Sequence, residues 1–302
     1  MDTLLLKKCW IFVTSMKNMD CAADMLSCIQ KLEGERWSQK MKKQYFLNLV
    51  QKGIVSPEYN RLSQEQGTLL KSGNATEEQV KALIAERYPN GRYPVNAYMQ
   101  PLLKLGLVKM EGQKDKCLQI TERGHRLLEG KISDEEMMIQ ALNDWKYPQT
   151  REDVSEPEWK GYNIRPMMAT IAVIEQVNQA DERNGIQPQG ITFDEFLVYL
   201  MTMYSCAQIE DRVYHLWLLH LIQKKNGEVA YERKLQQDKN QMMQEFAPIK
   251  SESMKSYRYG IFNALEKTGL FVIDYPNKRI NLKKEKETIS HQLLEKHGCK
   301  AY

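Results

Sequence analysis

The sequence predicts a mainly α protein with small β wings, organised as two winged helix-turn-helix subdomains in tandem. Two stretches with the same order of elements carry this prediction. In residues 105–128 a helix ends at Gly106, and a short strand, a polar turn, a return strand and another helix follow. Residues 262–282 repeat the order of helix, glycine, strand, turn and return strand, with Gly269 ending the helix. The two hairpins are nearly equal in length, and this order is typical of a winged helix.

The composition is that of a folded globular protein. The chain has 302 residues, of which 42% are hydrophobic and 27% are charged, enough for one large domain or two smaller ones. Its longest apolar stretch, around residues 196–203, is too short to cross a bilayer, and the N-terminus lacks the features of a signal peptide. The six cysteines are scattered without a Cys-x-x-Cys. We therefore expect reduced thiols, no disulfide, no zinc and a cytoplasmic protein.

The net charge of +4 is too small to indicate nucleic acid by itself. Its distribution is more informative, because both ends of the chain are basic and the middle is acidic.

The first half of the chain is expected to be helical up to the first hairpin. Apolar residues at helical spacing predict helices over residues 20–32 and 36–52. A third helix begins after Thr76, a suitable N-cap followed by two glutamates, and ends before the turn at 88–91. Pro94 can occupy the first turn of the next helix. Strands are expected at 105–108 and 117–120, and a helix at 121–128.

The second half begins with a Trp- and Pro-rich connector at 142–159, which we expect to pack between the subdomains. Helices are expected at 166–177, 193–204 and 213–224, and the helix that ends at Gly269 precedes strands at 270–273 and 278–282. The expected domains are the N-terminal helices with the first winged helix (1–148), the second winged helix (149–285) and a charged C-terminal linker or tail (286–302).

The helix before each hairpin is the candidate for base recognition, because a helix-turn-helix presents the exposed side of its second helix to the major groove. Arg suits guanine, Asn and Gln suit adenine, and Lys suits phosphate. In the first subdomain four candidates are spaced by four residues, opposite Val95, Met99 and Leu103. The DNA-binding candidates are Arg92, Tyr93, Asn96, Gln100 and Lys104 in the first subdomain, and Lys255, Ser256, Arg258 and Tyr259 in the second.

A search for catalytic residues finds no convincing site. A Mg²⁺-dependent nuclease needs paired carboxylates and commonly a lysine, and the best run is Glu158-Trp159-Lys160 with Asp144 or Asp153 upstream. That run lies in the connector and not on a strand beside a hairpin. His215 and His220 are five residues apart and do not share a helix face as zinc ligands would. We therefore assign no catalytic and no metal-binding residue.

Six short runs resemble, in order, the N-terminal half of type IIS restriction endonucleases of the AlwI kind and their nicking relatives. The resemblance implies two winged-helix subdomains that bind an asymmetric duplex site, joined by a linker to a Mg²⁺-dependent nuclease domain that cuts outside the site. It also implies that Glu158 and Lys160 are not catalytic, because they fall in the family's Glu-rich connector. The runs are Trp10 to Ser15, Leu32 to Trp37, Leu118 to Gly124, Trp145 to Pro148, Asn163 to Pro166 and Thr268 to Phe271.

The resulting prediction is sequence-specific binding of double-stranded DNA by the target-recognition half of a restriction-modification enzyme. We expect no cofactor for binding, Mg²⁺ for a nuclease domain that this chain lacks, and a monomer on DNA. Two alternatives remain open. One is a winged-helix transcription regulator or protein-partner scaffold, although two unlike winged helices suit an asymmetric site better than a palindrome. The other is a complete small nuclease that uses Asp144, Glu158 and Lys160.

Overall fold

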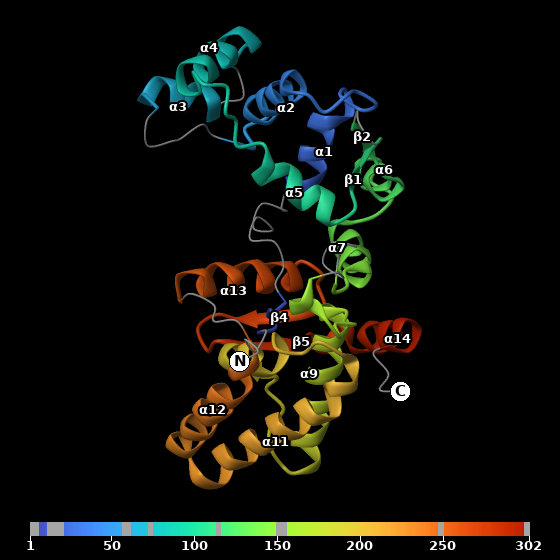
Figure 1. Cartoon of the computed structure of the whole chain (residues 1–302), viewed down its shortest axis with the longest axis vertical. Helices are drawn as coiled ribbons and strands as arrows, with labels where there is room; N and C mark the ends of the chain where they lie inside the picture. Colours follow the sequence, from blue (N-terminus) through green and yellow to red (C-terminus); the bar gives the residue numbers. More distant parts are fainter. Residues whose placement is uncertain are drawn as a thin grey trace. The chain divides into compact units, whose positions relative to one another are not determined.

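The structure is a computed structural model that describes residues 6–10, 21–55, 62–71, 75–112, 116–148, 156–246 and 251–298, without the side chains of 71, 243 and 251–258. The chain forms two compact units (Figure 1). The N-terminal unit is Ser15–Met137, and the C-terminal unit combines Met1–Thr14 with Met138–Tyr302. The described part is mainly helical with two small antiparallel sheets, which confirms the expected fold class at this level.

The N-terminal unit holds helices packed around one hairpin. Its core contains Met25, Tyr45, Phe46, Met99 and Leu118, which are all buried. The elements are α1 (Ala22–Gln30), α2 (Gln39–Gln51), α3 (Gln64–Lys71), α4 (Glu77–Arg87), α5 (Asn96–Lys104), β1 (Val108–Glu111), β2 (Cys117–Ile120) and α6 (Glu122–Leu128), and α7 (Asp134–Asp144) continues into the C-terminal unit.

The return strand β2 is paired on both sides. It is antiparallel to β1, with Val108 opposite Ile120. On its other side Gly34 donates its amide to the carbonyl of Leu118 at 2.8 Å, and Leu118 donates to Glu35 at 3.0 Å. The short segment 34–37 therefore acts as an edge strand, which satisfies the backbone groups of β2.

The expected elements of this unit are present, with shifted ends at one helix. Thr76 caps α4 in a reciprocal capping box with Gln79, as its position before two glutamates indicated. The helix expected from Pro94 begins at Asn96, so Arg92 and Tyr93 precede it. The strand expected from residue 105 begins at Val108, because Gly106 takes a positive φ of 65° and ends the helix.

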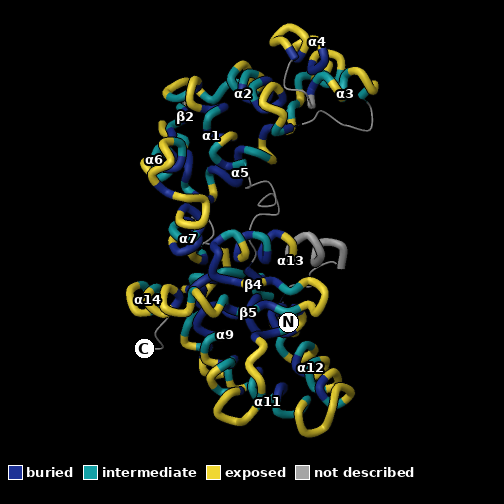
Figure 2. Tube along the Cα trace, turned by 180° about the vertical axis from the view of Figure 1, so that it is seen from behind, coloured by how far each residue is buried: buried dark blue, intermediate teal, exposed yellow. Residues whose placement is uncertain are grey.

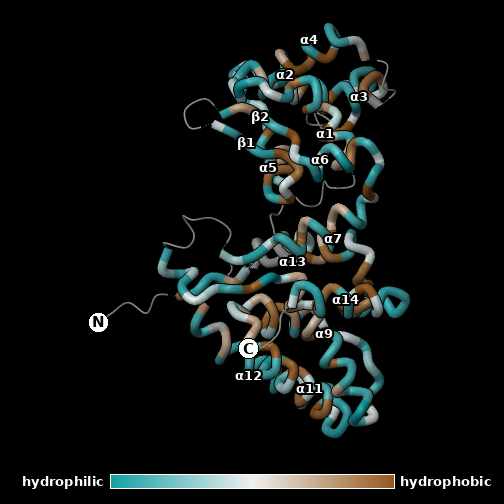
Figure 3. Tube along the Cα trace, turned by 90° about the vertical axis from the view of Figure 1, so that its right-hand side faces the viewer, coloured by the Kyte–Doolittle hydropathy of each residue, from teal (hydrophilic) through white to brown (hydrophobic). Residues whose placement is uncertain are grey.

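The C-terminal unit packs helices against a three-stranded antiparallel sheet of order β3-β5-β4. Figure 2 shows buried residues concentrated along α9, β4 and β5, and Figure 3 shows hydrophobic stretches on α5 and α9 alternating with hydrophilic ones. The main elements are α9 (Pro166–Arg183), β3 (Ile191–Thr192), α10 (Phe193–Glu195) with a π-helical turn (Phe196–Leu200), α11 (Ile209–Asn226), α12 (Glu228–Met242), α13 (Ser251–Glu266), β4 (Phe271–Asp274), β5 (Arg279–Leu282) and α14 (Glu287–His297). Short 3-10 helices lie at Pro157–Trp159, Cys206–Gln208, Met243–Glu245 and Lys284–Lys286.

The two units repeat one order of elements well beyond their hairpins. Each has a first helix, an edge segment on the return strand, a capped helix, two inserted helices, a helix before the hairpin and the hairpin itself. Ser38 caps α2 as Thr192 caps α10. The inserted pair is α3 and α4 in one unit and α11 and α12 in the other.

Three expectations about the C-terminal unit need correction. Residues 287–297 were expected to be part of a linker or tail, but they form α14, which packs on α9 with Ser290 buried. Cys206 is disulfide-bonded, so the expectation that all six cysteines are reduced is wrong, whereas Cys9, Cys21, Cys28 and Cys117 are free. The helix expected over 193–204 ends in the π-helical turn at Leu200.

The start of the chain belongs to the C-terminal unit. Lys7 donates its amide to the carbonyl of Glu245 at 2.8 Å, and Trp10 donates to Met201 at 3.2 Å. The indole of Trp10 is 1% exposed and packs edge-on against Phe196 at 5.7 Å between centroids. Within the described residues no helix combines the length and apolar character that a membrane crossing requires.

The Thr121-Glu122-Arg123-Gly124 run joins α6 to the end of α5. Thr121 caps α6 and donates its hydroxyl to the carbonyl of Gly106 at 2.6 Å. Arg123 donates to the carbonyl of Leu105 at 2.8 Å. Gly124 lies where an added Cβ would collide with the carbonyl oxygen of Leu107 and lie 2.7 Å from Cγ2 of Ile120. The run therefore has a structural role, fixing the position of the helix that precedes the hairpin.

Replacing Gly124 with alanine is expected to lower the free energy of unfolding by roughly 1–3 kcal/mol, because the methyl group overpacks this junction. Gly67 in α3 has no atom within 4 Å of its Cβ position. Gly67→Ala should therefore stabilise by about 0.5–1 kcal/mol. Urea unfolding followed by circular dichroism measures both, and equal effects of the two substitutions would contradict the close approach at Gly124.

Candidate nucleic-acid interface

Helix α5 has an exposed polar face and a buried apolar face. Met99 and Leu102 are buried, and Val95 is buried directly before the helix. Asn96, Gln100 and Lys104 are exposed and follow one another at helical spacing. The structure thus brings these three predicted residues onto one face, which carries two amide groups and one ammonium group.

Arg92 and Tyr93 lie beside this face in the segment that leads into α5. The Tyr93 ring is half-buried and stacks on Phe46, with 5.6 Å between centroids and an interplanar angle of 30°. It also contacts Tyr88 at 5.8 Å. Tyr93 therefore helps to pack the unit, while Arg92 is exposed next to the start of α5.

Helix α13 occupies the same place before the second hairpin. Ile261, Phe262 and Leu265 bury its inner face. The backbone of α13 includes Lys255, Ser256 and Arg258, but their side chains lie outside the described residues. Tyr259 is described and is 63% exposed.

Tyr259 has an aromatic partner that the sequence did not single out. Its ring stacks on Tyr275 in the β4–β5 turn, with 6.4 Å between centroids and an interplanar angle of 21°. The turn is held by Asp274, which accepts hydrogen bonds from the amide and the side chain of Asn277 at 3.0 and 2.7 Å. These hydrogen bonds hold the pKa of Asp274 below its usual range. The pairing joins residues of a helix and a turn, so no local periodicity could have revealed it.

The described parts of the connector, 142–148 and 156–159, pack within the C-terminal unit. Trp145 and Tyr147 are buried, and Tyr147 stacks on Trp159 with 5.0 Å between centroids. The expectation that this segment serves packing is confirmed for these aromatic residues, but its packing between subdomains stays a prediction.

The carboxylates considered for catalysis in this connector have a structural partner. Lys8 Nζ lies 2.9 Å from Glu156 Oε2 and 3.9 Å from Glu158 Oε1. Asp153 lies outside the described residues, and Asp144 and Lys160 are exposed. Among the described residues no group of three or more His, Cys, Asp or Glu side chains could hold a metal ion. The geometry around Glu158 is thus that of a salt bridge with the start of the chain.

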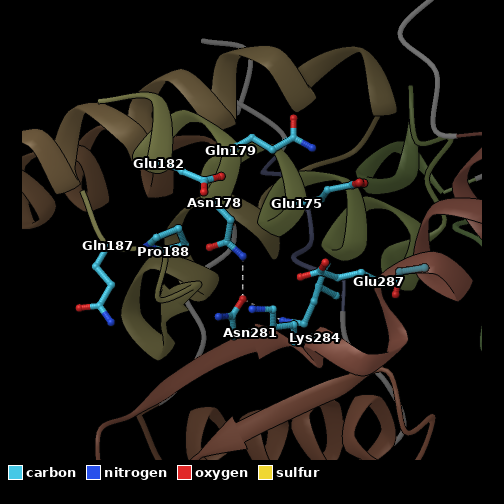
Figure 4. Close-up of a pocket in the computed structure, with 11 residues that line it drawn as sticks. Glu175, Asn178, Gln179, Glu182, Gln187, Pro188, Asn281, Lys284 and Glu287 are labelled. Carbon is cyan, nitrogen blue, oxygen red and sulfur yellow. Dashed lines mark hydrogen bonds between the residues drawn. The ribbon is translucent and has the colours of Figure 1, made fainter. Parts of the chain in front are cut away.

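A cavity of about 550 Å³ in the C-terminal unit has the wrong charge for DNA (Figure 4). Glu175, Glu182 and Glu287 line it together with Lys284. A hydrogen bond of 2.8 Å from Asn178 to Asn281 links α9 to β5 at its wall. Three carboxylates against one ammonium group disfavour a phosphate backbone, so we leave this cavity outside the nucleic-acid interface.

The C-terminal unit also contains a buried ionic cluster around His220. Nδ1 of His220 lies 2.7 Å from Asp181 Oδ2, and Nε2 lies 3.2 Å from Glu195 Oε1. Tyr231 donates its hydroxyl to Glu195 at 3.0 Å. Burial alone lowers the pKa of His220, but the two carboxylates outweigh burial and raise it to about 9. The cluster ties α11 to α9 and α10, so His220 is a buried residue of the core.

Exposed amide and basic side chains on α5, directly before the β1–β2 hairpin, are typical of a surface that binds nucleic acid. The comparison with protein families identifies the family. The AlwI restriction endonuclease family model matches residues 103–301, well over half of the chain, and the chain belongs to that family. This confirms the resemblance found in the sequence and gives the chain a restriction-enzyme role with DNA as its partner. No curated protein matches the chain.

The stability of the C-terminal unit is expected to fall at alkaline pH because of His220. Its pKa is raised from 6.5 to about 9 in the folded state. Protonated His220 therefore adds on the order of 3 kcal/mol to the free energy of unfolding. This contribution is complete below pH 6.5 and is lost as the pH rises through about 9. His220→Gln should therefore be less stable than wild type at pH 6, and the difference should narrow by pH 10. Urea midpoints across this range test it, and a constant difference would contradict a protonated His220.

Proposed function

We propose that this chain is the DNA-recognition part of a type IIS restriction or nicking endonuclease, and that each unit is a winged helix-turn-helix. The family match supplies the class of enzyme. The observation that carries the proposal is the repeated order of elements, which ends in each unit with a helix directly before a hairpin.

The sheet of the C-terminal unit supports the winged-helix assignment. Its first strand, β3, pairs with the last strand, β5, and β5 also pairs with β4. A winged helix has this order, with the return strand in the centre and the recognition helix immediately before the hairpin. The segment 34–37, β2 and β1 have the same order in the N-terminal unit. In both units a pair of inserted helices stands where a short turn would join the two helices of the motif.

Each candidate helix then has an assigned role. On α5, Asn96 and Gln100 suit adenine through paired donors and acceptors, and Lys104 suits a phosphate. Arg92, just before α5, suits guanine. Tyr93 holds Arg92 in place by packing on Phe46. On α13 we assign DNA contact to Lys255, Ser256, Arg258 and Tyr259.

Cleavage belongs, in this proposal, to a separate nuclease domain or subunit that uses Mg²⁺, and binding by this chain needs no cofactor. The carboxylates of the connector support this division, because Lys8 forms salt bridges with both Glu156 and Glu158. Two unlike units in one chain suit a short asymmetric site that is bound by a monomer. We place this activity in the cytoplasm.

Asn96→Ala and Gln100→Ala are each expected to weaken binding to the duplex that the chain enriches from a random pool by roughly 1–3 kcal/mol. Each variant loses a paired hydrogen bond to one base, so its preference should relax at one position only. Gln179→Ala, at an exposed glutamine of α9, is the matched control and should bind like wild type. Titration by fluorescence anisotropy measures all three, and affinities equal to that of the control would remove α5 from the interface.

The chain by itself is expected to bind this duplex without cutting it in the presence of Mg²⁺. Glu158→Ala should bind as wild type does, since Glu158 pairs with Lys8. End-labelled duplexes, incubated with Mg²⁺ and separated on a denaturing gel, report any nick. Cleavage at a fixed offset that disappears in Glu158→Ala would contradict the proposal that a separate domain or subunit cuts the DNA. It would show that this chain is a complete nuclease.

A further inference from the structure

We infer that the stacked rings of Tyr259 and Tyr275 form an apolar contact that reads a thymine methyl group in the bound site. This inference rests on the proposed function and deepens it. Tyr259 was a candidate on α13 from its position alone, and Tyr275 adds a residue of the β4–β5 turn to the recognition surface.

Both rings are exposed although they are large and mostly apolar. Tyr259 is 63% exposed and Tyr275 is 41% exposed. A single exposed tyrosine is common on protein surfaces. Here two tyrosine rings stack on each other, and both still leave apolar surface exposed to water. Exposed pairs of this kind are typical of binding surfaces, where tyrosine contributes much contact area for little conformational entropy.

The pair is held from beneath by the aromatic core. Tyr275 packs edge-on against Phe193, with 6.1 Å between centroids, and Phe193 contacts Phe262 at 4.4 Å. Phe262 contacts Phe196 at 5.1 Å. Because these residues are buried, the outer rings have little freedom to lose on binding. The contact surface is therefore organised before the ligand arrives.

The charges around the pair favour a base edge over a phosphate as its partner. Burial and the neighbouring Glu266 raise the pKa of Tyr275, so its hydroxyl stays neutral and a carboxylate lies close to the ring. A carboxylate repels phosphate. Basic residues lie slightly farther along the same hairpin, at Lys278 and Arg279, where they can meet the backbone of the duplex. In the major groove the apolar group of a base pair is the C5-methyl of thymine.

The test replaces thymine by deoxyuridine, one position at a time, in the duplex that wild type enriches. Removal of one contacted methyl should weaken binding roughly fourfold, as expected for the burial of one methyl-sized group. Tyr259→Ala and Tyr275→Ala should each weaken binding to the thymine duplex by about tenfold and should lose the discrimination at that position. Tyr214→Ala is the matched control, because Tyr214 is 55% exposed on α11 and lies outside the pair.

The outcomes separate this inference from the proposed function. If wild type enriches no duplex, the proposed function fails and the inference fails with it. If wild type enriches a duplex that contains no thymine, or binds every deoxyuridine duplex as tightly as the parent, the thymine contact is overturned while DNA recognition stands. The same holds if Tyr259→Ala and Tyr275→Ala bind like Tyr214→Ala. The deoxyuridine arm uses unmodified protein, so a folding defect in a variant cannot decide it.

Discussion

The return strand of each hairpin is the element on which the structure depends. β2 and β5 are each paired on both edges, which leaves neither with an unsatisfied backbone in the core of its unit. The edge segment approaches β5 so closely at Gly190 that a Cβ there would collide with the carbonyl oxygen of Ile280. After the return strand the chain bonds back to the start of the hairpin, through Thr121 to Leu107 and through Lys283 to Leu270. One central strand thereby fixes the helix before it, the hairpin and the helix after it.

This constraint fixes the positions of α5 and α13, the helices that precede the two hairpins. Both helices bury one side in their unit, and on α5 the opposite side is exposed. The buried cluster of Asp181, His220 and Glu195 has a similar role, because it locks the inserted helix α11 onto α9.

Local signals in the sequence predicted the parts that depend on neighbouring residues. The cap at Thr76, the glycine that ends α5 and the strand at 117–120 all follow from residues a few positions apart. Contacts between distant segments escaped prediction. Lys7 bonds to Glu245 in the C-terminal unit, and Tyr275 stacks on Tyr259 from a separate element. α14 escaped because its apolar residues are few, and only α9 gives it a surface to pack on. Helical spacing was enough to choose the candidate residues on α5. It did not predict how Arg92 lies relative to them, because α5 begins only at Asn96.

The central claim is that the two units together read one asymmetric sequence. Selection of bound duplexes from a randomised pool, at roughly physiological salt to suppress nonspecific phosphate binding, tests it most directly. The account predicts enrichment of a single short site without two-fold symmetry, with two groups of specified bases for the two units. Enrichment of a palindrome would indicate a dimeric regulator, and the absence of enrichment would indicate a partner other than DNA. Either result would contradict the account.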